Sequence, residues 1–93
     1  MMAVGIRSGR VVVPATETKD VVLSDLVGNK KALYRFFNSG KTGEAVTISR
    51  DGNVVHTLAS KDSVDLSIGN EKLSVTAGAK EEAEVVYELL GLI

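Results

Sequence analysis

The feature that most constrains this chain is its excess of valine. The sequence holds 14 valines against 9 leucines and 4 isoleucines, and only 4 aromatic residues. Because a β-branched side chain loses rotamer freedom in a helix and packs well on a pleated surface, this excess favours β-sheet. The length of 93 residues allows one domain, and the single proline and nine scattered glycines suit its turns.

Short strands are predicted at residues 11–13, 21–24 and 31–38, where β-prone runs end at turn residues. In the third run Tyr34 and Phe36 share one face, and Leu33, Arg35 and Phe37 share the other. A strand that is apolar on both faces is usually central in its sheet or covered on both sides.

A first hairpin is predicted at Arg50, Asp51 and Gly52, between strands at 44–49 and 53–58. A three-residue loop with Gly52 left-handed as the bulge places Ile48 opposite Val54 and Val46 opposite His56. The residues that then form one apolar face are Val46, Ile48, Val54 and Leu58. A two-residue loop would split this set between both faces, so we favour the three-residue loop.

A second hairpin is predicted at Gly69 and Asn70, between strands at 63–68 and 71–77. A two-residue loop of this type pairs Ile68 with Glu71, Leu66 with Leu73 and Val64 with Val75. The residues on its wet face are Asp65, Ser67, Ser74 and Thr76.

The segment 80–90 fits two patterns. Ala83, Val85, Tyr87 and Leu89 alternate with glutamates as in a strand, whereas Ala79, Ala83, Val86 and Leu90 fit a helical stripe. The all-β context favours the strand. We therefore predict one all-β domain over 1–93, a small antiparallel β-sandwich or jelly-roll-like barrel of seven or eight short strands. A C-terminal helix is the alternative, and an apolar N-terminal arm is expected at 1–13.

Catalytic signatures are incomplete. Gly40, Lys41 and Thr42 resemble the end of a phosphate-binding loop, but Arg35 stands where the first glycine belongs and a strand follows in place of a helix. His56 is the single histidine, and no serine has the glycine-flanked pattern of a nucleophile. We interpret His56 as a packed or rim side chain and predict no enzyme, no cofactor and no small-molecule substrate.

Carboxylates and basic residues also lack the spacing of a site. Asp62 and Asp65 are too few for calcium, which needs several loop oxygens. Glu81, Glu82, Glu84 and Glu88 fit a solvated face better than a pair of catalytic acids. Basic residues at Arg7, Arg10, Lys30, Lys31 and Arg35 lie near aromatic residues, but the net charge of −1 argues against nucleic acid as a partner.

The two ends of the chain are apolar. Free termini are usually polar and frayed, and an apolar patch usually marks a contact. The predicted assembly interface comprises Met1, Met2, Val4, Ile6, Arg7, Arg10, Leu90, Leu92 and Ile93. The equally weighted alternative is that both ends are strands of the domain's own core. No apolar run approaches the ~20 residues of a membrane span, and the first residues lack the order of a signal peptide.

The stretch 33–75, with its two tight turns at Arg50-Asp51-Gly52 and Gly69-Asn70, resembles the core of small β-sandwich proteins that decorate or cement bacteriophage heads. The resemblance implies a non-enzymatic virion subunit, often trimeric, that binds capsid protein or copies of itself and is assembled in the host cytoplasm. The alternative is a monomeric, otherwise cytoplasmic binding module for a glycan or a protein ligand. Its site would lie in the loops at 38–43 and 60–62, since loops commonly carry binding residues.

Overall fold

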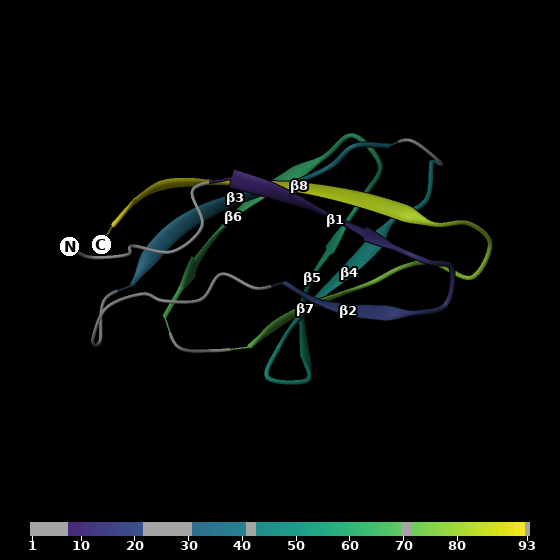
Figure 1. The fold of residues 1–93 in the computed structure, drawn as a ribbon, viewed down its shortest axis with the longest axis horizontal. Helices are drawn as coiled ribbons and strands as arrows, with labels where there is room; N and C mark the ends of the chain where they lie inside the picture. Colours follow the sequence, from purple (N-terminus) through teal and green to yellow (C-terminus); the bar gives the residue numbers. More distant parts are fainter. Residues whose placement is uncertain (1–7, 22–30, 41–42, 70–71, 93) are drawn as a thin grey trace.

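The computed structural model describes residues 8–21, 31–40, 43–69 and 72–92, which form eight strands in two four-stranded sheets (Figure 1). The strands are β1 (Ser8–Val13), β2 (Thr18–Val21), β3 (Ala32–Asn38), β4 (Val46–Arg50), β5 (Asn53–Leu58), β6 (Ser63–Ile68), β7 (Leu73–Thr76) and β8 (Ala83–Leu92). One sheet has the order β1-β8-β3-β6 and the other β2-β7-β4-β5, with antiparallel pairing throughout. The predicted all-β sandwich is confirmed.

The core lies between the two sheets and is centred on β3. Tyr34 and Phe36 are fully buried, and β3 pairs with β8 on one side and β6 on the other, as its two apolar faces predicted. Tyr87 of β8 completes an aromatic cluster, with ring centroids 6.0 Å from Phe36 and 6.4 Å from Tyr34. Each such pair contributes about 0.5–1.5 kcal/mol beyond its buried area, so this cluster joins β3 firmly to β8.

The C-terminal segment is a strand, and the helix alternative is wrong. Ala83, Val85 and Tyr87 point inward, while Val86 and Glu88 between and beside them are exposed. A bulge opposite the Leu33/Tyr34 step leaves Leu90 unpaired in the register and 40 % exposed. Pairing on both sides, with β1 and with β3, explains why the period-two pattern prevails over the helix propensity of 80–84.

The β4–β5 hairpin differs from its prediction. Its loop has two residues, Asp51 and Gly52, both with positive φ as the mirror-image turns require, and Arg50 pairs with Asn53. A bulge at Val55 then shifts the register, so that Ile48 faces His56 and Val46 faces Leu58. The bulge keeps Val46, Ile48 and Leu58 buried on one face and leaves Val54 and Val55 exposed. The prediction failed because it did not include this extra residue.

The predicted hairpin at Gly69 and Asn70 is wrong. β6 pairs with β3, and β7 pairs with β2 and β4, so the chain changes sheet between the two strands. Asn70 and Glu71 lie outside the described residues. Ile68 and Leu73 are still buried and Asp65 and Ser67 still exposed, because both sheets turn one face toward the same core. Alternation alone therefore fits either pairing.

The first third of the chain contributes β1 and β2, which are edge strands of the two sheets. Residues 8–13 of the predicted arm form β1, which is paired along its length with β8. The strand predicted at 21–24 overlaps the observed β2 only at Val21, and residues 22–24 lie outside the described part.

Candidate interaction face

The outer surface of the β1-β8-β3-β6 sheet, here called the outer face, carries exposed apolar side chains. Val12, Phe37 and Val86 alternate with inward-pointing neighbours and are 44 %, 37 % and 39 % exposed. In the pairing register, Val86 lies between Arg10 of β1 and Phe37 of β3, and Phe37 is opposite Ser63 of β6. One row across all four strands thus has an apolar centre and polar ends.

The next row across the outer face is charged. It runs from Ser8 through Glu88 and Arg35 to Asp65. Arg35 binds Asp65 with two parallel bonds, Nε to Oδ1 at 2.8 Å and Nη2 to Oδ2 at 3.2 Å. The hydrogen bond from Arg35 holds the pKa of the Asp65 carboxyl below its usual value. Such fork-shaped pairs are more specific in geometry than single contacts.

A second ion pair lies at the edge of the same face, where Arg10 Nη1 is 3.1 Å from Glu84 Oε2. The exposed arginines of the outer face are therefore already paired with carboxylates on neighbouring strands. A partner that covers this face buries two arginines whose counter-charges lie within the chain, and this avoids the large penalty of leaving those arginines unpaired.

An open hollow of about 340 Å³ lies in the middle of the outer face. All four strands line it, with Ser8, Arg35, Phe37, Ser63, Val86, Tyr87 and Glu88. On the inner side of the same sheet, Gly9 of β1 leaves room for the Tyr87 side chain, because a Cβ on that residue would lie 2.7 Å from the Tyr87 hydroxyl oxygen. A mostly apolar, open hollow of this size suits one bulky side chain of a partner.

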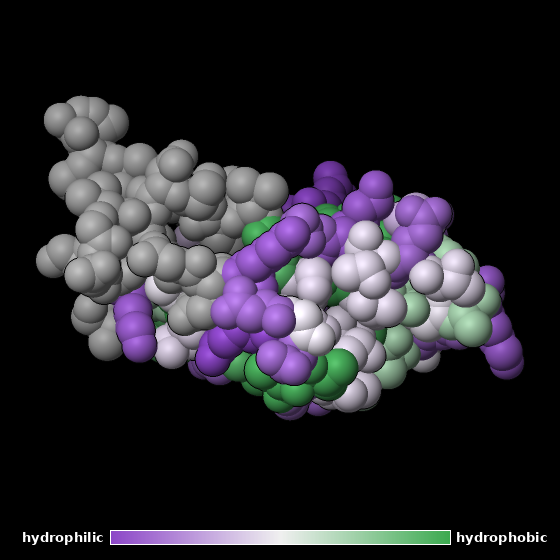
Figure 2. All heavy atoms as spheres, turned by 90° about the horizontal axis from the view of Figure 1, so that it is seen from below, coloured by the Kyte–Doolittle hydropathy of each residue, from purple (hydrophilic) through white to green (hydrophobic). Residues whose placement is uncertain are grey.

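A second exposed apolar surface lies on the other sheet, at the strand β5. Val54 is 65 % exposed, and Val55, the bulged residue, is 42 % exposed. Figure 2 shows an apolar patch, in green, among hydrophilic residues on the side of the molecule that carries the β4–β5 hairpin. We call the outward side of residues Asn53–Leu58 the β5 edge.

At one end of the sandwich, buried Asn38 ties three loops together. Its Nδ2 donates to the carbonyl oxygens of Glu44 at 2.8 Å and Leu58 at 3.1 Å, and its Oδ1 accepts from the Gly40 amide at 3.0 Å. Its backbone carbonyl also accepts from the Lys61 amide, at 2.9 Å. The loops predicted as a binding site, 38–43 and 60–62, therefore do meet, although Lys41 and Thr42 lie outside the described residues.

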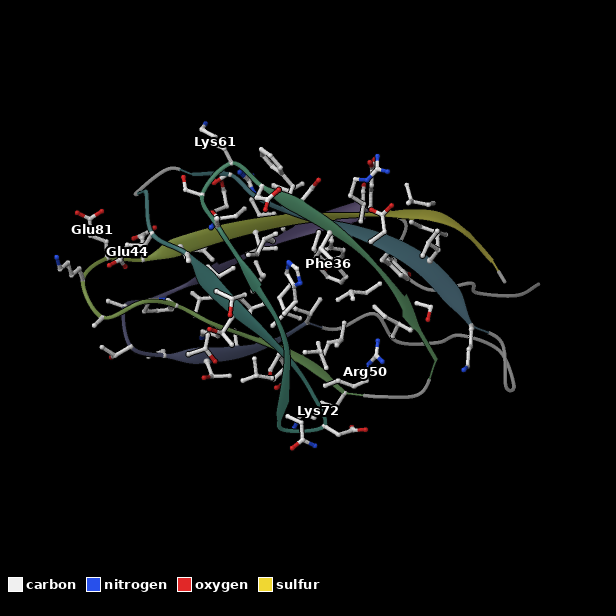
Figure 3. The ribbon with its side chains drawn as sticks, turned by 180° about the vertical axis from the view of Figure 1, so that it is seen from behind. Phe36, Glu44, Arg50, Lys61, Lys72 and Glu81 are labelled. Atoms are coloured by element: carbon white, nitrogen blue, oxygen red, sulfur yellow. The ribbon has the colours of Figure 1, made fainter. Side chains whose placement is uncertain are left out.

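The Glu44 carboxylate belongs to the same end of the sandwich. Its Oε2 accepts from the Glu81 amide at 3.3 Å, and Figure 3 shows the two glutamates side by side, with Lys61 on the neighbouring loop. Sequence reasoning gave Glu44 no role and placed Asn38 only at the start of a loop. An asparagine at the end of a strand and directly before Ser-Gly was the available signal, since Asn readily bonds to nearby backbone.

The residues considered for catalysis or metal binding are placed elsewhere. His56 is half-buried opposite Ile48, not opposite Val46 as predicted. Asp65 is bound to Arg35, and the Asp62 Oδ1 accepts from the Ser63 amide. Across 8–21, 31–40, 43–69 and 72–92 no group of three or more metal-ligating side chains comes together. The segment after Thr42 leads into strand β4, so the helix of a phosphate-binding loop is missing there.

Most of the predicted assembly interface cannot be placed. Met1, Met2, Val4, Ile6, Arg7 and Ile93 lie outside the described residues. Leu90 is exposed on β8, Leu92 pairs in the backbone register with Ala32, and Arg10 is engaged with Glu84. Phe37, Val12 and Val86, the apolar residues of the outer face, were not predicted as a contact. The signal available was the strand at 31–38 with apolar residues on both faces.

No protein-family model and no curated protein matches the chain. Among solved structures, a family 35 carbohydrate binding module from an environmental isolate is similar with a TM-score of 0.43 and 18% sequence identity. The match covers 98% of this chain and 71% of that chain. In the described part of the chain, no helix is long and apolar enough to cross a membrane.

Proposed function

We propose that this chain is a non-enzymatic assembly subunit that binds a protein partner through the outer face of its β1-β8-β3-β6 sheet. The specific form of the proposal is a virion decoration subunit, whose partner is capsid protein. The observation that carries it is the combination of exposed Val12, Phe37 and Val86 with two arginines that are paired to carboxylates within the same face.

Physical chemistry supports a protein as the partner. Interface cores are rich in aromatic and aliphatic side chains and arginine, and poor in unpaired charge. The hollow around Phe37 and Val86 would receive an apolar side chain, and Arg35 and Glu88 would form its polar rim. Full burial of a valine or phenylalanine side chain contributes about 1.5–3 kcal/mol. A small domain with a limited core gains stability from such a contact.

The test is co-sedimentation of the purified chain with capsid shells of the virus that encodes it. The variants Phe37→Lys and Val86→Lys each place a charge in the apolar row, and we expect each to weaken binding at least tenfold. Val54→Lys is the matched control, because it makes the same change at a more exposed residue of the other sheet. Thermal unfolding verifies that all three variants fold.

Two results would contradict the proposal. If the wild-type chain does not pellet with the shells, capsid protein is not its partner. Equal binding by wild type, Phe37→Lys and Val86→Lys would place the contact elsewhere on the molecule.

A second candidate function is a binding module for a glycan or a protein ligand at the Asn38 end of the sandwich. It is favoured by the contact between loops 38–40 and 60–62, where a Cβ on Gly40 would lie 2.6 Å from the Ser60 hydroxyl oxygen. Polar loops held this closely by a rigid sheet are a common setting for ligand sites.

A glycan array distinguishes this second candidate from the first. If it is correct, the wild-type chain retains a defined glycan, and Lys61→Asn weakens that binding while Lys19→Asn on β2 does not. Asparagine suits position 61 because the residue there has a φ of 66°, which asparagine tolerates. A blank array with intact binding to capsid shells rules out a glycan ligand.

A further inference from the structure

The outer face carries more carboxylates than arginines. Within the four strands of its sheet, the charged residues are Arg10, Arg35, Asp65, Glu84 and Glu88. Arg10 is bonded to Glu84, and Arg35 donates two hydrogen bonds to Asp65. Glu88 is therefore the surplus carboxylate, and in the described part of the chain no hydrogen bond or ion pair joins it to another side chain.

The neighbours of Glu88 leave its charge uncompensated. Arg35 lies opposite Glu88 in the pairing register, so the two side chains attract each other. The pKa of Arg35 is raised chiefly by its hydrogen bond with Asp65, and the charge of Glu88 adds a smaller part. One guanidinium thus stands between two carboxylates, and on the other side of Glu88 the register places uncharged Ser8. The hollow of the outer face therefore has a net negative charge beside its apolar lining.

This surplus charge limits which partner can cover the outer face. Burying Glu88 without a counter-ion would carry a large desolvation penalty, which a cation supplied by the partner offsets. Neither Arg10 nor Arg35 solves the problem, since moving either arginine to Glu88 leaves its present carboxylate unpaired. Charge complementarity therefore favours a partner that presents a basic side chain at the hollow.

We propose that the hollow receives an arginine side chain of the protein partner, whose guanidinium pairs with Glu88 and lies against the Phe37 ring. The inference rests on the proposed function, because it names the group that the partner presents to the same face. Phe37 of β3 and Glu88 of β8 are diagonal neighbours on adjacent strands, and both line the hollow. Diagonal neighbours are within reach of one long side chain, so one guanidinium contacts both.

The lining of the hollow favours arginine over lysine. A guanidinium is planar and more weakly hydrated than an ammonium group, forms two parallel bonds with a carboxylate, and stacks on an aromatic ring. Phe37 and Val86 offer apolar surface to the methylene stem of the same side chain. Arginine is also enriched in the cores of protein interfaces, where lysine is depleted.

Co-sedimentation with capsid shells tests the pairing in the complex. We expect Glu88→Gln to weaken binding at least about tenfold, since it leaves the partner's arginine without its counter-charge. Glu17→Gln is the matched control, because it removes the same charge from an exposed residue of the turn between β1 and β2 and should bind like the wild type. Added NaCl should weaken binding of the wild type more steeply than binding of Glu88→Gln. Thermal unfolding verifies that both variants fold.

A small probe tests the hollow without any shell. The isotope-labelled chain is titrated with N-acetyl-arginine amide and followed by NMR. We expect shifts of the amide signals of residues that line the hollow, with a dissociation constant between about 1 and 30 mM. Glu88→Gln should abolish this response and Glu17→Gln should keep it. The neutral citrulline analogue should give no response, and the lysine analogue a weaker one.

The inference and the proposed function fail in different ways. Equal shell binding by wild type and Glu88→Gln, with Phe37→Lys still defective, overturns the arginine pairing while the outer face remains the contact. If the wild type does not bind shells, the capsid partner is wrong, and the probe then decides the inference. A response to the arginine probe that Glu88→Gln abolishes supports it. No response, or an equal response to the citrulline or lysine analogue, overturns it.

Discussion

Replacement of Asn38 by alanine tests the claim that this side chain ties the loop end of the sandwich together. The residue is 2 % exposed, and the substitution removes three hydrogen bonds, two from Nδ2 and one to Oδ1. A typical intramolecular bond contributes about 0.5–1.5 kcal/mol net, and more when its partner is left buried and unpaired. The expected loss in free energy of unfolding is therefore about 3 kcal/mol, a large share of the roughly 5–15 kcal/mol of an ordinary domain.

Urea unfolding followed by circular dichroism measures this loss, with Asn53→Ala as the control. Asn53 is exposed at the start of β5, and its replacement should change stability by less than about 0.5 kcal/mol. Asn38→Asp keeps the acceptor for Gly40 but turns a carboxylate toward the carbonyls of Glu44 and Leu58, so it should be at least as destabilising as alanine at pH 7. A loss below 1 kcal/mol for Asn38→Ala would refute this account.

Further predictions concern the core, the β4–β5 turn and the ion pair of the outer face. Phe36→Ala empties a fully buried site and should cost about 3–5 kcal/mol in urea unfolding, whereas its outward neighbour Phe37→Ala should cost less than about 1 kcal/mol. Gly52→Ala, at a φ of 87°, should cost about 1–2 kcal/mol in thermal unfolding, whereas Gly91→Ala meets no atom within 4 Å and should be nearly neutral. The lowered pKa of folded Asp65 means that the unfolded chain binds its proton first, so stability is lost as pH falls below the ordinary value of 3.8. Asp65→Asn should flatten that acid dependence, and an unchanged pH profile would show that the ion pair contributes nothing.

The sequence was sufficient for most of the strands and for their inward faces. Alternation grouped Tyr34 with Phe36 in one strand and Ala83, Val85 and Tyr87 in another, and both groups are buried. The prediction of these faces holds because each strand buries one face whichever strand lies beside it.

Strand pairing was harder to predict from the sequence, because it depends on residues far apart in the chain. Gly69 and Asn70 have good hairpin chemistry, yet β6 finds its partner in β3, where Arg35 meets Asp65 across the strands. The β4–β5 register depended on a bulge at Val55, and nothing in the local alternation marks an inserted residue.

The proposed binding surfaces were foreseen only in part. The meeting of loops 38–43 and 60–62 was expected as a possible site, but the role of Asn38 depends on backbone groups that only the folded chain brings near it. The outer face could not be predicted from the sequence, because Val12, Phe37 and Val86 come from three distant segments. Only the fold places these segments on adjacent strands.

Chemical labelling at Val86 tests most directly whether the outer face is a contact surface. The chain has no cysteine, so Val86→Cys supplies a single reactive thiol at the centre of that face. Lys19→Cys, on β2 of the other sheet, is the reference site. We predict that a maleimide modifies both variants rapidly in the free protein, and that on capsid shells the Val86→Cys thiol alone becomes protected. Equal labelling of the Val86→Cys thiol in the free and shell-bound chain would contradict the assignment of this face.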